Sequence, residues 1–193
     1  MKKAIIIHCW GGTPDYCWYP DTQRTLEKAG FTVTIPVMPR TDHPLYAEWL
    51  AAAQAAIGVP DEDTYLIGHS LGCITILHYL QSMTADKKIG GAVFVAGFAQ
   101  PLGSNYSEIS SFFDMQIQPA KVTQHLKYPL VAIHSDNDPH VPLEHGAVFE
   151  RDFGAQLIIR PGMKHFSGAR NNPESCTQVP DVAEAIIRMS TQQ

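Results

Sequence analysis

Short apolar runs rich in β-branched residues recur along the chain and alternate with segments of helical periodicity. The runs span residues 3–8, 31–37, 64–68, 91–96, 129–135 and 155–160, and the helical segments span 19–29, 44–57, 71–84, 119–126, 142–153 and 179–191. Runs that are apolar almost throughout are typical of parallel strands covered on both faces. Their alternation with helices implies right-handed crossovers. The sequence therefore predicts an α/β fold, a doubly wound, mostly parallel sheet of about six strands flanked by helices.

Length and composition favour one globular domain, expected to span residues 1–193. Hydrophobic residues make up 45% of the chain and charged residues 17%, and no segment approaches the roughly 18 apolar residues of a membrane span. The two lysines at the start precede only a short apolar run, 4–7, which is shorter than the core of a secretory signal. We therefore expect a cytoplasmic protein.

Charge and cysteine content narrow the partners and the compartment. The formal net charge is −5 and lysine and arginine form no block, so neither nucleic acid nor an anionic membrane is an expected partner. The four cysteines lie apart without a C-x-x-C pair, as is typical of free thiols in a reducing compartment, with a bridge between Cys9 and Cys17 as the alternative.

The stretch TYLIGHSLGCITILHYL, residues 64–80, joins a predicted strand directly to a predicted helix through the pentapeptide GHSLG. This strand–turn–helix setting makes G-x-S-x-G a sharp turn that exposes a nucleophilic serine, here Ser70. Side chains at Gly68 and Gly72 are expected to collide with the neighbouring strand or helix. The alternative role for Ser70 is that of a helix N-cap. We predict that Ser70 is a nucleophile.

A serine hydroxyl needs a histidine base, which in turn needs an orienting carboxylate. In this arrangement the chain order is Ser, then Asp or Glu, then His, each following a strand. After the run 129–135 comes DNDPHVP, which offers Asp136 and Asp138. Asp138 begins a D-x-x-V-P pattern that leads into the next helix, whereas Asp136 is suited to bonding loop N–H groups. We favour Asp138.

The base is expected in PGMKHFSG, the loop that follows the run 155–160. Of the nine histidines, only His165 lies after the next strand's exit. Five others precede the candidate carboxylates, His134 is on a strand, and His145 is inside a helix. His140 shares the loop of Asp138 and is not expected to reach Ser70. The order of the three groups therefore predicts His165 as the base.

Two backbone N–H groups are expected to bind the oxyanion that forms on a substrate carbonyl. The first is that of Leu71, at the start of the helix after the serine. The second comes from the loop HCWGGT after the first strand, where Trp10 is the expected donor and Gly11 and Gly12 allow close approach. Trp10 has the alternative role of hydrophobic cover over the edge of the sheet.

These motifs together resemble the α/β-hydrolase superfamily, and within it the small retinoblastoma-binding protein 9/YdeN family of serine hydrolases. The resemblance rests on IIIHCWGG, Trp18, PVMPR, EWL, YLIGHSLGCITILHYL, AVFVAGFA, SDNDPHVP and GMKHF, which are spread over most of the chain. It implies a reduced hydrolase sheet without the usual leading hairpin or a cap domain, and a triad of Ser70, Asp138 and His165.

Two departures from the family pattern concern the loop after the first strand and a partner. The first-strand motif usually reads His-Gly, whereas this chain has His8-Cys9, a side chain that can narrow the loop. The mammalian member binds a pocket protein through Leu-x-Cys-x-Glu. This chain has LGCIT at 71–75, without the glutamate and within the predicted helix after Ser70, so that partner is not expected.

Residues 97–119 occupy the place where larger hydrolases insert a cap. About twenty residues are too few for a separate lid domain, so an open site for a small or short-chain acyl substrate is expected. Two roles remain open for the apolar side chains of this segment. They line an acyl pocket, or they belong to a short helix packed on the sheet. The residues concerned are Phe98, Phe112, Phe113 and Met115.

The sequence thus predicts a serine hydrolase that cleaves a small carboxylic ester, thioester or amide without a cofactor or a metal. A second hypothesis is a binding or adaptor protein of low or no activity on the same scaffold, since fold does not determine function. A metal site at His134, His140, His145 and Asp136 has no recognised ligand spacing. A thiol nucleophile at Cys73 is weaker still, because this residue resembles a small core residue.

Overall fold

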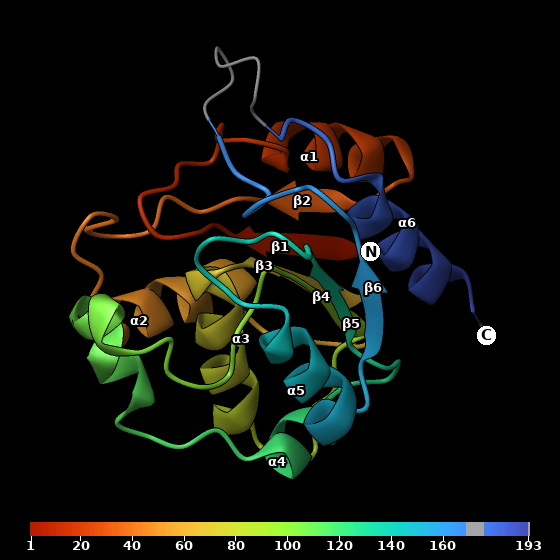
Figure 1. Cartoon of the computed structure of the whole chain (residues 1–193). Coiled ribbons are helices and arrows are strands. Elements are labelled where there is room, and N and C mark those ends of the chain that lie inside the picture. The colour runs from red at the N-terminus through yellow and green to blue at the C-terminus, as the bar shows by residue number, and fades with distance from the viewer. Residues whose placement is uncertain (169–175, 193) are drawn as a thin grey trace.

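Six parallel strands form one sheet in the part of the chain that the computed structural model describes, residues 1–168 and 176–192 (Figure 1). They are β1 (Lys3–Ile7), β2 (Thr32–Thr34), β3 (Thr64–His69), β4 (Gly91–Val95), β5 (Val131–His134) and β6 (Gln156–Ile159). Their order across the sheet is β2-β1-β3-β4-β5-β6. The predicted fold class is confirmed.

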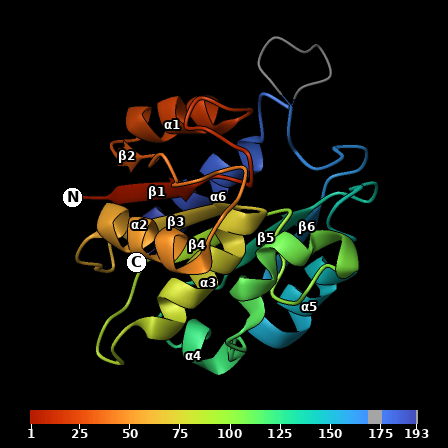
Figure 2. The same ribbon diagram turned by 90° about the vertical axis from the view of Figure 1, so that its left-hand side faces the viewer.

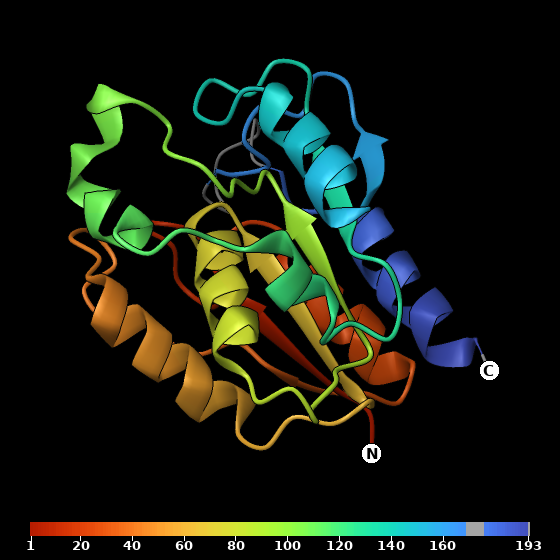
Figure 3. The same cartoon turned by 90° about the horizontal axis from the view of Figure 1, so that it is seen from below.

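Helices cover both faces of the sheet (Figures 1 and 2). They are α1 (Tyr19–Lys28), α2 (Tyr46–Ile57), α3 (Leu71–Ser82), α4 (Pro119–Thr123), α5 (Glu144–Phe153) and α6 (Pro180–Thr191), with a 3₁₀ helix, η1, at Ser104–Phe113. In Figure 1, α1 and α6 lie on one face and α2, α3, α4 and α5 on the other. Seen from below, η1 lies beside α2 (Figure 3), where Phe112 packs edge-on against Tyr46.

Most elements are one to a few residues shorter than predicted, and two of the differences have a clear physical cause. Strand β2 ends at Thr34 rather than at residue 37, because it is an edge strand paired only with β1 and Pro36 has no N–H to donate. Helix α4 ends at Thr123 rather than at 126, because Leu126 forms a parallel bridge with Ile89 instead. Neither change affects the order of the elements.

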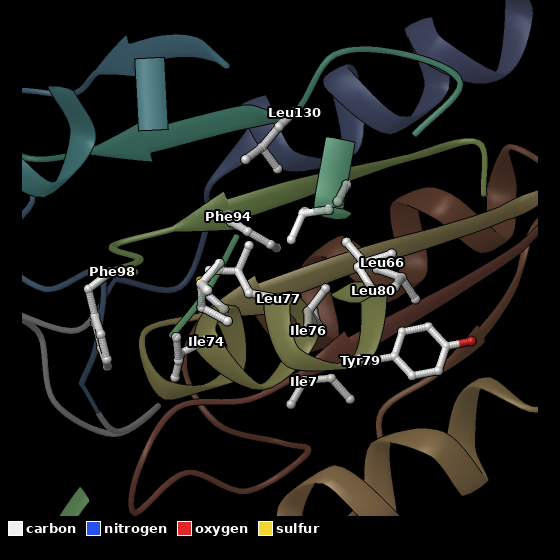
Figure 4. Packing of buried hydrophobic residues seen from close by; sticks show 14 of the residues in the cluster. Ile7, Leu66, Ile74, Ile76, Leu77, Tyr79, Leu80, Phe94, Phe98 and Leu130 are labelled. Atoms are coloured by element: carbon white, nitrogen blue, oxygen red, sulfur yellow. The ribbon is translucent and has the colours of Figure 1, made fainter. Parts of the chain in front are cut away.

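Alternation of side chains along each strand separates two hydrophobic cores. On β1, Ala4 and Ile6 pack with α1 and α6, whereas Ile5 and Ile7 pack with α2 and α3. Figure 4 shows the second core, in which side chains of α3 meet Leu66 and Phe94 of the sheet. Both faces of the central strands are buried, which explains why the predicted runs are apolar throughout.

The direction in which strands are added reverses between β1 and β3. From β1 the chain passes to β2 on one side and then returns to place β3 on the other side. In parallel sheets such a reversal opens a crevice at the carboxyl ends of the two strands, and ligands bind there. The loop after β1 and the turn after β3 meet at this crevice. None of the helices in the described ranges has the length and apolar character needed to cross a membrane.

The turn from β3 into α3 is packed against the end of β1. Ser70, the residue of this turn, has φ 52° and ψ −114°, a strained conformation for a residue with a side chain. A Cβ at Gly72 would lie 2.1 Å from the Ile7 carbonyl oxygen, and one at Gly68 would lie 2.8 Å from Cys73 Cα. The predicted collisions are therefore present, and they involve backbone atoms that cannot move aside.

Replacing Gly72 with alanine is expected to lower the free energy of unfolding by roughly 3 kcal/mol or more, because the new methyl group must displace β1 or α3. The control is Gly30→Ala at the end of α1, where φ is +87° but nothing lies within 4 Å of the added carbon. This control should lose about 1–2 kcal/mol from backbone strain alone. Urea denaturation measures both. Equal losses in the two variants would contradict the close packing.

Candidate active site

A cavity of about 280 Å³ opens at the crevice between β1 and β3. Its polar side is formed by groups from four loops: Cys9, Trp10, Ser70, Leu71, His140 and His165. Every residue predicted for the catalytic triad and the oxyanion site except Asp138 therefore borders this one cavity. Asp138 contacts the Nδ1 atom of His165 and does not border the cavity itself.

Ser70 is positioned by backbone contacts on both sides of the turn. Its N–H donates to the carbonyl of Val95 at 2.9 Å, and its carbonyl accepts from Cys73 N–H at 2.9 Å. Its side chain makes no capping hydrogen bond at the start of α3. Ser70 thus occupies the N-cap position of α3 without the side-chain hydrogen bond of a cap, and it borders the cavity.

Asp138 holds the imidazole of His165. The Nδ1 atom of His165 lies 2.8 Å from Oδ2 and 3.0 Å from Oδ1 of Asp138. The Asp138 side chain is only 1% exposed, whereas that of His165 is 12% exposed at the cavity. An Nδ1–H that donates to the carboxylate leaves Nε2 as the free acceptor.

Burial by itself raises the pKa of Asp138, but its hydrogen bonds outweigh this effect. The His165 imidazole and the backbone N–H groups of Val141 and His140 stabilise the charged carboxylate, and the pKa lies below its ordinary value. The two N–H groups donate to Oδ1 at 3.0 and 2.8 Å. Asp138 is therefore an ionised, fully bonded carboxylate at neutral pH.

The loop that carries Asp138 is bonded to the loop that carries His165 at successive positions. Side-chain oxygens of the first loop accept backbone N–H groups of the second: Ser135 from Met163 at 2.9 Å, Asp136 from Gly162 at 2.8 Å, and Asn137 from Lys164 at 2.8 Å. The structure thus brings Asp138 against His165, whereas Asp136 bonds a loop N–H group. The sequence offered both Asp136 and Asp138 as partners of the histidine and favoured Asp138.

Trp10 and Leu71 border the cavity, and their backbone N–H groups have no acceptor among the described residues. The neighbours of Trp10 in its loop are all bonded: Cys9 to the Tyr19 hydroxyl, Gly11 to Thr41 O, and Gly12 to Cys9 O. Trp10 is thus the one residue of 9–12 whose N–H is available, although Cys9 places a side chain in this loop. Its indole Nε1 also donates to Asp42 O at 3.0 Å.

A buried chain of hydrogen bonds connects the loop after β1 to the loop of His165. Cys9 N–H donates to the Tyr19 oxygen at 3.1 Å, the Tyr19 hydroxyl donates to His69 Nδ1 at 2.6 Å, and His69 Nε2–H donates to the His165 carbonyl at 2.9 Å. Burial lowers the pKa of His69 to about 3, so the ring stays neutral. The sequence pointed to His69 only as a neighbour of Ser70, and no pattern pointed to Tyr19.

The alternative nucleophiles are buried thiols. Cys73 is fully buried, and burial raises its pKa well above the ordinary value. Cys9 borders the cavity, but burial raises its pKa to about 11, so it is a thiol at neutral pH. Cys9 and Cys17 are both free, so the alternative of a bridge between them is wrong.

His140 lies closer to the site than the sequence suggested. Its ring centroid is 5.0 Å from that of His165, and its Nδ1 atom is hydrogen-bonded to the Tyr106 hydroxyl of η1 at 3.1 Å. The chain returns on itself at 139–142, which the sequence pattern did not reveal. Tyr106 was likewise not identified from the sequence. Among the described residues, no three His, Cys, Asp or Glu side chains are grouped so that they could hold a metal ion.

The apolar wall of the cavity differs from the prediction for residues 97–119. Of the four residues proposed to line an acyl pocket, only Phe98 borders this cavity, together with Leu102, Tyr106 and Ile109. Phe112 is fully buried in the core, as in the alternative of a packed short helix, and Phe113 and Met115 border a second cavity.

Comparison with known proteins identifies the family. The model of the serine hydrolase family matches residues 4–176. The chain belongs to this family. YdeN of Bacillus subtilis, which is named as a hydrolase, is 30% identical over 96% of this chain and 94% of its own. The serine hydrolase RBBP9 of Rattus norvegicus is 25% identical over 72% of this chain and 74% of its own.

Solved structures show the same fold. The crystal structure of YdeN superposes on this serine hydrolase with a TM-score of 0.91 over the whole of both chains, at 26% identity. Est1E of Butyrivibrio proteoclasticus has a TM-score of 0.72 at 18% identity, covering 98% of this chain and 86% of its own. The α/β-hydrolase fold and the family expected from the sequence are confirmed.

Removing the Tyr19 hydroxyl tests the buried hydrogen-bond chain. Tyr19→Phe leaves Cys9 N–H and His69 Nδ1 buried without partners, so the free energy of unfolding should fall by about 2 kcal/mol. The matched control is Tyr79→Phe, which removes a hydroxyl that has no partner among the described residues and should cost far less. Urea denaturation distinguishes the two. If Tyr19→Phe left the free energy of unfolding unchanged, that result would contradict the proposed chain of hydrogen bonds.

Acid is expected to destabilise the protein partly through His134, which is fully buried with no partner for either ring nitrogen among the described residues. Burial lowers its pKa to about 4, whereas the unfolded chain binds this proton near pH 6.5. Between these values the unfolded state holds more protons, so the free energy of unfolding falls as pH falls, by up to roughly 3 kcal/mol.

His134→Leu should therefore lose less stability than wild type between pH 7 and pH 4, as measured by thermal melts across this range. The control is His43→Leu, at an exposed histidine, which should follow the wild-type pH dependence. An unchanged pH dependence in His134→Leu would show that this histidine does not resist protonation in the folded state.

Proposed function

We propose that this serine hydrolase cleaves small carboxylic esters through an acyl-enzyme on Ser70, with His165 as general base and Asp138 as the carboxylate that orients it. The observation that carries the proposal is the placement of His165. Its Nδ1 is held by a buried, ionised Asp138, and its ring borders the same cavity as the Ser70 hydroxyl. These are the relations that nucleophilic catalysis by serine requires.

In the first step Ser70 Oγ bonds to the carbonyl carbon of the ester while its proton passes to Nε2 of His165. Asp138 stabilises the imidazolium that results. Ser70 and His165 both border the cavity, and no direct hydrogen bond joins them. Such bonds are often long before substrate binds and shorten in the complex.

The carbonyl oxygen becomes an oxyanion in this step and needs donors that are already in place. The N–H groups of Trp10 and Leu71 border the cavity and have no acceptor among the described residues. Leu71 is the first residue of α3, so the positive end of the helix dipole adds to the stabilisation. Losing one such donor typically costs about 10²–10³-fold in rate.

Collapse of this intermediate breaks the bond to the alcohol, which leaves with the proton from His165. Water then attacks the acyl-enzyme, His165 takes its proton, and Ser70 is restored when the acid departs. These steps require no cofactor. The residues that border the cavity include no lysine, arginine, aspartate or glutamate in the described part of the chain. A neutral acyl group is therefore the proposed ligand, carried by an ester, a thioester or an amide.

The direct test is labelling with a fluorophosphonate probe together with hydrolysis of p-nitrophenyl acetate. Wild type should be labelled and active, Ser70→Ala should be unlabelled, and its kcat should fall by about 10⁴-fold or more. An unlabelled wild-type protein, beside a reactive serine-hydrolase control, would reject the proposal and favour the binding or adaptor hypothesis.

Asp138 and Asp136 carry the same functional group two positions apart, so the same substitution can be compared at both. Asp138→Asn should lower kcat by roughly 10⁴-fold, because the amide no longer holds His165 in the required tautomer. Asp136→Asn removes a carboxylate two positions away that bonds only Gly162 N–H and should keep most of the activity. The reverse result would assign the orienting role to Asp136.

A further inference from the structure

A second cavity, of about 310 Å³, lies behind the apolar wall of the first. It is enclosed by the segment after β4, by η1 and the chain that follows it, and by α5, with Ala99, Pro101, Phe113, Ile117, Val148 and Phe153 among its walls. Its lining also includes the polar residues Gln100, Gln116 and Asp152, and it contains none of the groups assigned to the proposed reaction. The two cavities have no lining residue in common.

Two elements, the segment that follows β4 and η1, contribute residues to both cavities. In the segment that follows β4, Phe98 and Leu102 border the first cavity, whereas Ala99 and Pro101 border the second. On η1 the same division holds, because Ile109 borders the first cavity and Phe113 the second. Adjacent side chains of the same two elements therefore point to opposite sides of a shared partition.

Two phenylalanine rings meet inside this partition. The ring centroids of Phe98 and Phe113 are 6.1 Å apart, with planes inclined by 36°. Phe98 is 1% exposed and also packs edge-on against His145 of α5, at 6.4 Å. Figure 4 shows Phe98 beyond the end of β4, apart from the main group of core side chains. The pair is thus a packed contact between η1, α5 and the sheet.

We propose that Phe98 and Phe113 determine acyl-chain specificity, closing the first cavity at its far end and restricting this enzyme to esters of short, aliphatic acyl groups. The inference rests on the function proposed above. A volume of about 280 Å³ is at the small end for ligand pockets, and the reacting carbonyl and the leaving group occupy part of it. A longer chain must displace the packed rings or remain in water. The second cavity is the space such a chain enters once the rings are removed.

The test is kcat/KM for p-nitrophenyl acetate, butyrate and octanoate in wild type, Phe98→Ala, Phe113→Ala and the double variant. Wild type should prefer acetate or butyrate to octanoate. The ratio of octanoate to acetate should rise by about 10-fold or more in Phe98→Ala and most in the double variant, because several methylene groups gain contact with the apolar side chains of the second cavity, such as Ile117 and Val148. Phe113 lies outside the first cavity, so Phe113→Ala should raise the ratio by allowing the Phe98 ring to move.

Phe112→Leu is the matched control. Phe112 is next to Phe113 on η1 and fully buried, but it packs against Tyr46 and Trp49 and borders neither cavity. Its substitution should lower the melting temperature and leave the octanoate-to-acetate ratio unchanged. Phe98→Leu and Phe113→Leu, which remove less volume, should give the same trend on a smaller scale and replace the alanine variants if these do not fold.

Two results would contradict the proposed role of Phe98 and Phe113 in acyl-chain specificity and leave the proposed function in place. One is a wild-type enzyme that hydrolyses octanoate as well as acetate. The other is an unchanged ratio in folded Phe98 and Phe113 variants whose acetate hydrolysis still depends on Ser70. Both proposals fail together if the wild-type protein neither reacts with the fluorophosphonate probe nor hydrolyses any ester of the series.

Discussion

The close packing of the first turn of α3 against the end of β1 is the constraint on which the rest of the structure depends. The space at Gly72 is limited by the carbonyl of Ile7, and that at Gly68 by the backbone of Cys73. Because α3 starts so close to β1, the chain has to turn sharply at Ser70, which takes a positive φ. The same contact places the first N–H of α3 beside the loop that follows β1.

Around this turn, the polar groups of the site are held by hydrogen bonds between separate loops, and those of Tyr19 are buried. Tyr19 and His69 connect the loop after β1 to the carbonyl of His165, and the loop of Asp138 bonds the loop of His165 at successive positions. A buried bond left unmade costs more than a formed one contributes, so such networks favour one arrangement. The proposed base and the proposed oxyanion donor are therefore positioned by a shared set of contacts, an advantage for a reaction that depends on alignment.

The segment between β4 and α4 determines what this arrangement can accept. It is short and forms only η1 as regular structure, yet it supplies most of the apolar wall of the cavity and the partition behind it. YdeN and Est1E share the sheet and its helices with this chain. Substrate choice on a common scaffold is made by such connecting segments, since they can change without disturbing the strands.

The sequence by itself determined the order of strands and helices, the strained serine after β3, and the family. Each of these is local, because apolar runs, helical periodicity and the GHSLG turn depend on neighbouring residues. It also directed attention to Asp138 and His165, since chain order restricts where the partners of such a serine can occur.

Only the tertiary structure decided which groups meet across the fold. The bond from Tyr19 to His69, the approach of His140 to His165, and the meeting of Phe98 with Phe113 each join residues that no periodicity relates. It likewise showed that, among residues 9–12, Trp10 alone keeps a free N–H, because its neighbours' acceptors come partly from distant segments. Such contacts depend on how loops from separate strands converge at one edge of the sheet, and that convergence is a property of the packed molecule.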